Sequence, residues 1–459
     1  MPTRNSKLGS ESIGRLLYQF SLPAIIGMTA SSLYNVIDRI FIGHGVGPLA
    51  ISGLALTLPL MNLAIAFGAL VGVGASVLIS IRLGEKRGED AGRILGTTVA
   101  LNLVLSTSYS LVMFLLLAPI LRLFGASPET LPYAKEFMQV ILVGNVFQHS
   151  YLGLNNIMRS AGFPHKAMMI TIFTVAVNLA LAPVFIFLFH WGIRGAALAT
   201  VTAQLVGLLL VLRHFWDSER SVRFQRKYFF LDRSIVREIF AIGMSAFFMQ
   251  ICASMVAVVM NRQLVRFGGD YAVGAFGVVN SVVMMVAMVV IGLTQGMQPI
   301  VGYNYGAGRF DRMQRAFRLT VLAASCVALG GFALGELLPH EIARLFTDDV
   351  HLLGVAERGM RIAMIAFPVI GLPMVTSSFF QSIGRAKISI VLSLSRQVLF
   401  LIPALVLLPH LCGFAGVWAA MPVSDGCAAL LALGILRHQR DRLKSRTTPP
   451  TEEPAILLP

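Results

Sequence analysis

Charged residues are scarce in this chain of 459 residues. They make up 13% of the sequence, whereas a soluble globular protein has about 25%. Hydrophobic residues make up 56%, and the mean hydropathy is +0.76. So few charges cannot cover a particle of 49.7 kDa with solvated groups. This composition excludes a water-soluble fold and predicts an all-α membrane protein whose outer surface faces lipid.

Cysteine is also rare, which excludes a disulfide framework. The four cysteines, Cys252, Cys326, Cys412 and Cys427, have no metal-ligand spacing. We interpret them as small buried hydrophobic residues, and we expect no metal and no cofactor. The sequence also lacks a nucleophile, a base and an orienting group near one membrane surface, so an enzyme is not expected.

Acidic residues are outnumbered by basic ones, which gives a formal net charge of +15. Nucleic-acid binding would require basic residues on a soluble face with aromatic residues between them. Here the basic residues lie between apolar runs, so no nucleic-acid partner is expected.

Apolar runs of about 20 residues, the length that crosses a bilayer, recur along the whole chain. Twelve runs predict membrane spans at 16–42, 50–80, 93–118, 134–160, 168–190, 193–214, 236–264, 272–302, 315–338, 357–383, 388–408 and 413–436.

Lys and Arg concentrate in alternate loops, and basic loops remain in the cytoplasm during insertion. The middle loop alone carries seven: Arg213, Arg220, Arg223, Arg226, Lys227, Arg233 and Arg237. The opposite loops carry mostly acids, such as Glu129, Asp270 and Asp348. We therefore expect both termini to be cytoplasmic in a multi-pass protein of the cell inner membrane.

Two loop motifs repeat at one offset along the chain. Gly84 and Gly306 follow the second and eighth spans, and 306 − 84 = 222. Gly162 and Gly384 end the fourth and tenth spans, and 384 − 162 is again 222. The repeat predicts two pseudo-symmetric six-helix lobes around a central cleft, the geometry that alternating-access transport requires.

The repeat also predicts a division of the chain. We expect an N-terminal lobe (1–214), a basic cytoplasmic linker (215–235), a C-terminal lobe (236–436) and a cytoplasmic tail (437–459).

Asp38 is an acid deep in the first apolar span, where a charged side chain is costly. Tyr34 and Asn35 precede it by one turn on nearly the same face, and Pro23 permits a bend earlier in the helix. An acid in a low-dielectric site can gain and lose a proton, which predicts proton coupling. The alternative is a residue at the membrane surface paired with Arg39, although neighbouring helix positions point about 100° apart.

Further polar residues lie inside the first half. Asn178 is in the fifth span, and the fourth span carries a stripe of Asn145, Gln148, His149, Asn155 and Asn156. A ligand path and hydrogen bonding between helices explain such a stripe equally well. His149 fits a hydrogen-bonded spectator better than a proton relay.

The second half contains two opposite charges, Arg396 and Asp425, in the last two spans. These spans form a hairpin whose turn is expected near residues 409–411, so the two residues lie at the same depth. We favour a structural ion pair over a gating or proton-sensitive switch.

Methionines concentrate in the seventh and eighth spans, where flexible side chains suit a surface that accepts many apolar shapes. Ordinary core packing is the alternative. The residues expected to line the substrate cavity are Asn35, Gln148, Asn155, Gln250, Met255, Met284, Met288 and Gln295.

The stretch Gln295–Ala307, with the sequence QGMQPIVGYNYGA, resembles the multidrug and toxic compound extrusion (MATE) family, especially its MepA-like branch. Leu22-Pro23-Ala24, the run Tyr34–Asp38 and the run Gln381–Lys387 support this resemblance, which covers nearly the whole chain. It implies a twelve-helix exporter that uses proton or sodium entry to expel cationic or amphipathic drugs.

The resemblance further implies that Pro23, Tyr34, Asp38 and Asn178 form the cation-coupling site. Family members with a second carboxylate have an Asp four residues after the Asn, where this chain has Ala182. Losing one carboxylate weakens a sodium site more than a one-proton site, so a proton antiporter is favoured over a sodium-coupled exporter. A lipid-linked saccharide flippase is the other alternative, although few interior cations are present. We expect a monomer that contacts small substrates, H⁺ (possibly Na⁺) and the lipid bilayer.

Overall fold

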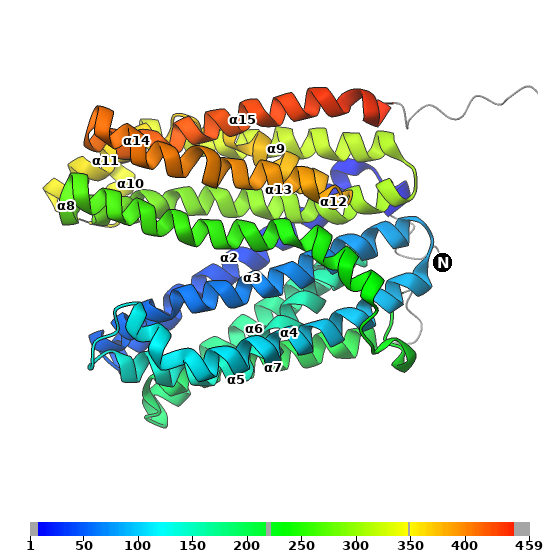
Figure 1. The fold of residues 1–459 in the computed structure, drawn as a ribbon, viewed down its shortest axis with the longest axis horizontal. Coiled ribbons are helices and arrows are strands. Elements are labelled where there is room, and N and C mark those ends of the chain that lie inside the picture. The colour runs from blue at the N-terminus through cyan, green and yellow to red at the C-terminus, as the bar shows by residue number, and fades with distance from the viewer. Residues whose placement is uncertain (1–7, 217–221, 348, 445–459) are drawn as a thin grey trace, which may run out of the picture.

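The computed structural model describes residues 8–216, 222–347 and 349–444, and every regular element in these ranges is a helix (Figure 1). Residues 217–221 of the expected linker and 445–459 of the expected tail lie outside these ranges. The N-terminal helices are α2 (Ile13–Gly45), α3 (Pro48–Gly84), α4 (Gly88–Leu123), α5 (Leu131–Ser160), α6 (Pro164–Pro183) with the π-helix η1 (Val184–Leu188), and α7 (Gly192–Phe215). After the short helix η2 (Arg226–Tyr228) come α8 (Arg233–Gly306), α9 (Phe310–Leu337), α10 (Pro339–Arg344), α11 (Val350–Met364), α12 (Phe367–Ser382), α13 (Ala386–Leu394), the π-helix η3 (Ser395–Leu401), α14 (Ile402–Cys412) and α15 (Phe414–Lys444).

Helix α8 contains two membrane spans. Its backbone breaks at Gly269, which has φ 66° and ψ −165°, and the chain folds back there between Arg233–Gly269 and Tyr271–Gly306. When the two halves of α8 are counted separately, ten helices among the described residues are long and apolar enough to cross a membrane. The bent pair α11 and α12 makes an eleventh span. Helix α5 is not among these eleven, because its polar stripe lowers its hydropathy. It has 30 residues, a length of about 45 Å at 1.5 Å per residue, which is enough to cross a bilayer. With α5 as the twelfth span, the twelve-helix fold in two lobes is complete.

The tenth predicted span, 357–383, is wrong as a single continuous helix. It begins earlier, at Val350, where the Asp349 carboxylate accepts hydrogen bonds from the backbone N–H groups of His351 and Leu352. It then bends by 55° between Met364 and Phe367. Pro368 follows the bend and has no N–H group to continue the hydrogen-bond ladder.

The prediction that all four cysteines are buried is also wrong. Cys252 is buried and Cys427 is half-buried, but Cys326 and Cys412 are exposed. Cys326 lies within α9, and Cys412 is the last residue of α14, next to the turn at Gly413.

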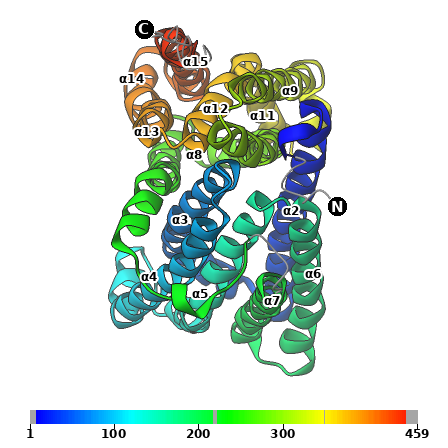
Figure 2. The ribbon, with the colours of Figure 1, turned by 90° about the vertical axis from the view of Figure 1, so that its right-hand side faces the viewer.

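The two lobes lie close together at one end of the bundle and diverge toward the other (Figure 1; Figure 2 looks along the bundle from the first of these ends). We call the first end, which contains the turns α3–α4 and α8–α9, the closed end. The opposite end, which contains the turn α2–α3 and the break at Gly269, is the open end.

Two glycines related by the repeat allow α3 and α8 to touch at the closed end. A Cβ atom on Gly84 would lie 2.0 Å from the carbonyl oxygen of Tyr303, and one on Gly306 would lie 2.1 Å from that of Ile81. Both pairs keep the offset of the sequence repeat, because 306 − 84 and 303 − 81 are both 222. The pseudo-twofold axis therefore passes through a crossing that has no room for side chains.

Helix α2 belongs to both lobes. Near the closed end, Leu16 and Phe20 pack in the core of the C-terminal lobe with Met297 and Ile300. Near the open end, Ile42 packs in the core of the N-terminal lobe. A change in the position of either lobe must therefore be accommodated along α2.

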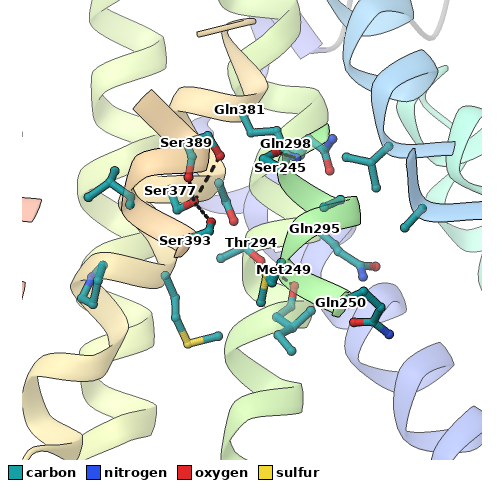
Figure 3. A pocket seen from close by; sticks show the side chains of 18 of the residues that line it. Ser245, Met249, Gln250, Thr294, Gln295, Gln298, Ser377, Gln381, Ser389 and Ser393 are labelled. Carbon is teal, nitrogen blue, oxygen red and sulfur yellow. Dashed lines mark hydrogen bonds between the residues drawn. The ribbon is translucent and has the colours of Figure 1, made fainter. Parts of the chain in front are cut away.

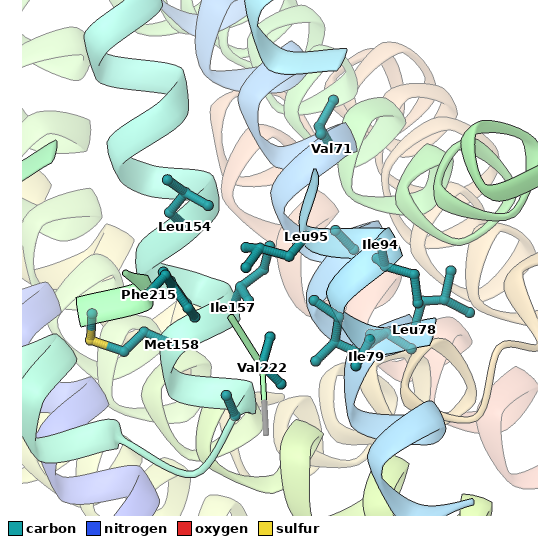
Figure 4. Close-up of a cluster of buried hydrophobic side chains, with 14 of the residues drawn as sticks. Val71, Leu78, Ile79, Ile94, Leu95, Leu154, Ile157, Met158, Phe215 and Val222 are labelled. Carbon is teal, nitrogen blue, oxygen red and sulfur yellow. The ribbon is translucent and has the colours of Figure 1, made fainter. Parts of the chain in front are cut away.

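The linker folds onto the N-terminal lobe beside the closed end. Val222 joins a buried cluster with Ile94 and Leu95 of α4 (Figure 4). The Tyr228 hydroxyl donates a hydrogen bond to the Glu89 carboxylate, and Lys227 Nζ lies 3.4 Å from the same oxygen. These contacts hold the linker against the first turn of α4.

Gly96→Ala is expected to loosen the linker. A Cβ atom at position 96 would lie 2.4 Å from the carbonyl oxygen of Tyr228, and such overpacking costs about 1–3 kcal/mol. The rate of tryptic cleavage after Lys227 should therefore increase several-fold. Gly92→Ala on the same helix is the matched control, because its Cβ would lie 3.6 Å or more from the linker. Equal cleavage of the two variants would contradict this packing.

Candidate cation and substrate sites

Asp38 lies inside the N-terminal lobe, on α2. Its side chain is buried, with 9% of its surface exposed, and its Oδ1 atom accepts no hydrogen bond from any described residue. Arg39, the neighbour in sequence, is exposed and makes no ion pair with it. A buried carboxyl oxygen without a donor disfavours the charged form, because burial removes the water that would stabilise it.

Asn178 and Thr200 form a second polar group in this lobe. Asn178 Nδ2 donates to Thr200 Oγ1 at 3.1 Å, and Asn178 Oδ1 is buried without a donor among the described residues. Pro23 and Tyr34, the other residues predicted for coupling, are buried and half-buried on α2.

Asn155 lies in a hydrogen-bonded cluster between α5 and α6. Its Nδ2 atom donates to Thr171 Oγ1 at 3.0 Å and to the carbonyl oxygen of Ala167 at 3.3 Å. The Tyr151 hydroxyl donates to the same threonine oxygen at 3.3 Å. In this conformation the side chain holds two helices together and does not line the cavity described next.

A polar cavity of about 300 Å³ lies in the C-terminal lobe (Figure 3). Its lining contains five serines, one threonine, five glutamines and one arginine, and no acidic residue. These residues are Ser245, Gln250, Thr294, Gln295 and Gln298 of α8; Ser377, Ser378 and Gln381 of α12; Ser389 and Ser393 of α13; and Arg396 and Gln397 of η3. Ile65, Ala69 and Val73 of α3 form an apolar wall contributed by the other lobe.

Several of these polar groups already have partners. Ser377 Oγ shares hydrogen bonds with Ser389 Oγ at 3.1 Å and Ser393 Oγ at 2.7 Å (Figure 3). Gln381 Nε2 donates to Ser245 Oγ at 2.5 Å. In contrast, Gln298 Nε2 and Gln397 Oε1 are buried without a partner among the described residues.

Arg159 connects the lobes through Gln295, which lines this cavity. Its guanidinium group extends from the end of α5 and donates a hydrogen bond to Gln295 Oε1 on α8. The sequence places Arg159 in a basic loop, yet its side chain reaches the interior. A second contact between the lobes is the ion pair of Arg82 with Glu238, at 3.1 Å.

Arg396 and Asp425 form the predicted contact, with Arg396 Nε 2.7 Å from Asp425 Oδ1. The expected turn of the hairpin, 409–411, is misplaced, because α14 continues to Cys412 and the chain turns at Gly413. The two charges meet despite their unequal distances from Gly413. The π-helix η3 lies in the longer arm and shortens it, since its i→i+5 hydrogen bonds place more residues in each turn.

Arg396→Gln alone is expected to destabilise the protein by about 2–4 kcal/mol, because it leaves the buried Asp425 carboxylate unpaired. The double variant Arg396→Gln/Asp425→Asn should recover much of that loss. Thermal unfolding of both proteins, compared with Asp425→Asn, measures the coupling. Equal melting temperatures for the two Arg396→Gln proteins would contradict a structural ion pair.

The remaining predicted cavity residues do not lie in one place. Gln250 and Gln295 line the polar cavity. Met255 and Met284 are exposed toward the open end, and Met288 Sδ accepts a hydrogen bond from Ser32 across the lobes at 3.2 Å. Two others lie apart from this cavity in the described structure: Asn35, which is exposed and donates to the backbone of its own helix, and Gln148, which is half-buried on α5.

Sequence reasoning missed the serine side of the cavity and Thr200. Ser377, Ser389 and Ser393 fall within apolar runs, where a serine is usually interpreted as a small residue at a contact between two helices. The available signal was the four-residue spacing of Ser389 and Ser393, which places both hydroxyl groups on one helix face together with Gln397.

A family model described as MatE matches residues 23–184 and 245–406. The matched segments begin 245 − 23 = 222 residues apart, which is the offset of the internal repeat. The chain belongs to the MatE family. The multidrug export protein MepA of Staphylococcus haemolyticus is 26% identical over 432 residues, which cover 94% of this chain and 95% of that protein.

Solved structures agree with this membership. The MATE multidrug transporter DinF-BH, solved in complex with a ligand, superposes with a TM-score of 0.88 at 37% identity, covering 95% of this MatE chain and 98% of that one. An outward-facing multidrug resistance MATE transporter superposes with a TM-score of 0.91 at 24% identity, covering 97% and 100% of the two chains. The second likeness concerns the fold alone.

Proposed function

We propose that this chain is a proton-coupled antiporter that exports cationic or amphipathic compounds by alternating access. Membership of a family of transporters, with multidrug exporters among its relatives, supports export over enzymatic activity. The observation that carries proton coupling is Asp38, a buried acid whose Oδ1 has no donor among the described residues. Asp38 lies on α2, which packs on both lobes. Its protonation can therefore influence the position of one lobe relative to the other.

The charge distribution supports an orientation. The closed end carries Arg82, Arg87, Arg309 and Arg312, and by the positive-inside rule this supports a cytoplasmic closed end and cytoplasmic termini. The described conformation is then outward-open, in the inner membrane. We propose that a monomer is sufficient for transport. Its moving lobes are residues 1–214 and 236–436, its linker is 215–235, and residues 437–459 form a cytoplasmic tail.

Proton coupling is favoured over sodium coupling because this chain lacks the second carboxylate of the two-carboxylate family members. Ala182, four residues after Asn178, is fully buried and offers no side-chain oxygen. Sodium, like other hard cations, prefers several oxygen ligands, whereas a proton requires one acceptor.

The test is efflux from proteoliposomes that contain the purified protein. Cationic dyes, amphipathic compounds and a lipid-linked sugar are loaded in turn, and a proton gradient and then a sodium gradient are imposed. The proposal expects dye efflux driven by the proton gradient alone. Efflux driven only by sodium, or transfer of the lipid-linked sugar without dye efflux, would overturn it.

A further inference from the structure

We propose that the cavity between α8, α12 and α13 binds the carboxylate end of an amphipathic compound. This inference rests on the proposed export function and narrows the class of substrate that the C-terminal lobe accepts. It follows from the charge of the lining, the unpaired donors in it, and the apolar wall opposite.

The lining presents a cation and no accessible anion. Arg396 is the single charged residue among the residues that line the cavity, and 27% of its side chain is exposed. Its partner, Asp425, is outside the lining, with 4% of its side chain exposed. The Asp425 carboxylate offsets part of the guanidinium charge, but it is buried, so a permanent cation entering the cavity would meet the guanidinium group and no exposed acid.

The guanidinium group has unused hydrogen-bonding capacity. Within the described part of the chain, its only ion pair or side-chain hydrogen bond joins Nε to Asp425 Oδ1. Its two terminal amino groups are thus available to a second planar acceptor. A carboxylate matches this fork in both geometry and charge.

A second, independent group points to an acceptor-bearing ligand. Gln298 Nε2 is buried at the cavity without a hydrogen-bond acceptor among the described residues. Unpaired buried donors are costly, so a native protein retains them where a ligand or water uses them. In the neighbouring serine cluster, Ser377 shares hydrogen bonds with Ser389 and Ser393. Among the described lining residues, Gln298 Nε2 is the buried donor that remains without a partner, and Gln397 Oε1 is a buried acceptor without one.

The opposite wall suits a hydrocarbon body. Ile65, Ala69 and Val73 of α3 face the polar groups, with Met249 and Met374 beside them. A volume of about 300 Å³ is at the lower end for small-molecule sites. The cavity therefore accommodates a small amphipathic acid with its carboxylate toward η3 and its apolar part toward α3.

The test uses three fluorescent probes with one ring system: 1-pyrenebutyrate, 1-pyrenebutanol and a pyrenylbutyl trimethylammonium salt. Their affinities are measured for the full-length protein in lipid nanodiscs. Charge-assisted pairing predicts that the carboxylate binds about tenfold or more tightly than the alcohol. Equal affinities, or tighter binding of the ammonium salt, would overturn the proposal.

Three variants assign that preference to the cavity. Arg396→Gln/Asp425→Asn, which leaves no unpaired buried acid, should make carboxylate and alcohol bind alike. Gln298→Leu retains the ion pair and should weaken carboxylate binding several-fold, which keeps the test valid if the double variant does not fold. Ala69→Phe, which fills the cavity, should weaken all three probes. A carboxylate preference unchanged in the first two variants would overturn the assignment.

Asp38→Asn separates this proposal from the proposed function, because Asp38 lies in the other lobe. It should retain the carboxylate preference in nanodiscs while losing proton-driven efflux. If export fails to depend on a proton gradient but the preference persists, the coupling mechanism is wrong and the binding site stands. If the preference is absent while Asp38-dependent efflux persists, the site is wrong and the exporter stands.

Discussion

Asp38→Asn is expected to reduce proton-driven efflux to the level of empty liposomes while the protein remains folded. The amide has nearly the shape of the carboxyl group but cannot exchange a proton. Because Asp38 Oδ1 has no donor in the described structure, the substitution breaks no hydrogen bond of that oxygen and removes a group that is costly to bury when charged. The melting temperature should therefore be equal to or above that of the wild type.

The matched control is Asp311→Asn, a substitution of an exposed acid in the first turn of α9. It changes the net charge by the same amount and should leave efflux intact. Normal pH-driven efflux by Asp38→Asn, at equal amounts of folded protein, would remove Asp38 from the mechanism.

Gly243→Leu is expected to hold the lobes apart at the closed end and to stop transport. A Cβ atom on Gly243 would lie 1.8 Å from the carbonyl oxygen of Leu70 on α3. A backbone oxygen cannot rotate away as a side chain can, so the clash costs at least about 1–3 kcal/mol in this conformation. It costs nothing in a conformation where this end is open. The variant should therefore shift the population toward that conformation.

Distances across the closed end measure this shift. Arg82 and Glu238 form an ion pair between the lobes at 3.1 Å, so cysteines at these positions, in a background without the native cysteines, should be joined by a short bis-maleimide, which alkylates both thiols. The same pair should fail to cross-link in Gly243→Leu. Gly330→Leu on α9 is the control, because a Cβ there meets nothing within 4 Å. Efficient cross-linking and transport by Gly243→Leu would contradict alternation at this crossing.

The architecture could be predicted from the sequence because it depends on long-range regularities. Twelve apolar runs and one offset of 222 residues suffice for two lobes, and the family model repeats at the same offset. The offset did not predict a contact, although Gly84 and Gly306, which mark the loop repeat, both lie at the crossing of α3 and α8.

Local departures from regular helix were not predictable in the same way. The bend before Pro368 and the π-helix at Ser395–Leu401 depend on which backbone groups find partners, and apolar runs do not encode this. The polar cavity has a similar cause. Its serines and glutamines come from separate helices, and only the packing of those helices brings them together around Arg396.

The central claim is that Asp38 exchanges a proton for substrate, and proton release on substrate binding tests it most directly. Purified protein in weakly buffered detergent solution is mixed with saturating substrate while a pH-sensitive dye is monitored. The account predicts that the wild type releases protons on binding and that Asp38→Asn, with substrate bound, releases none. Equal proton release by the two proteins would contradict it.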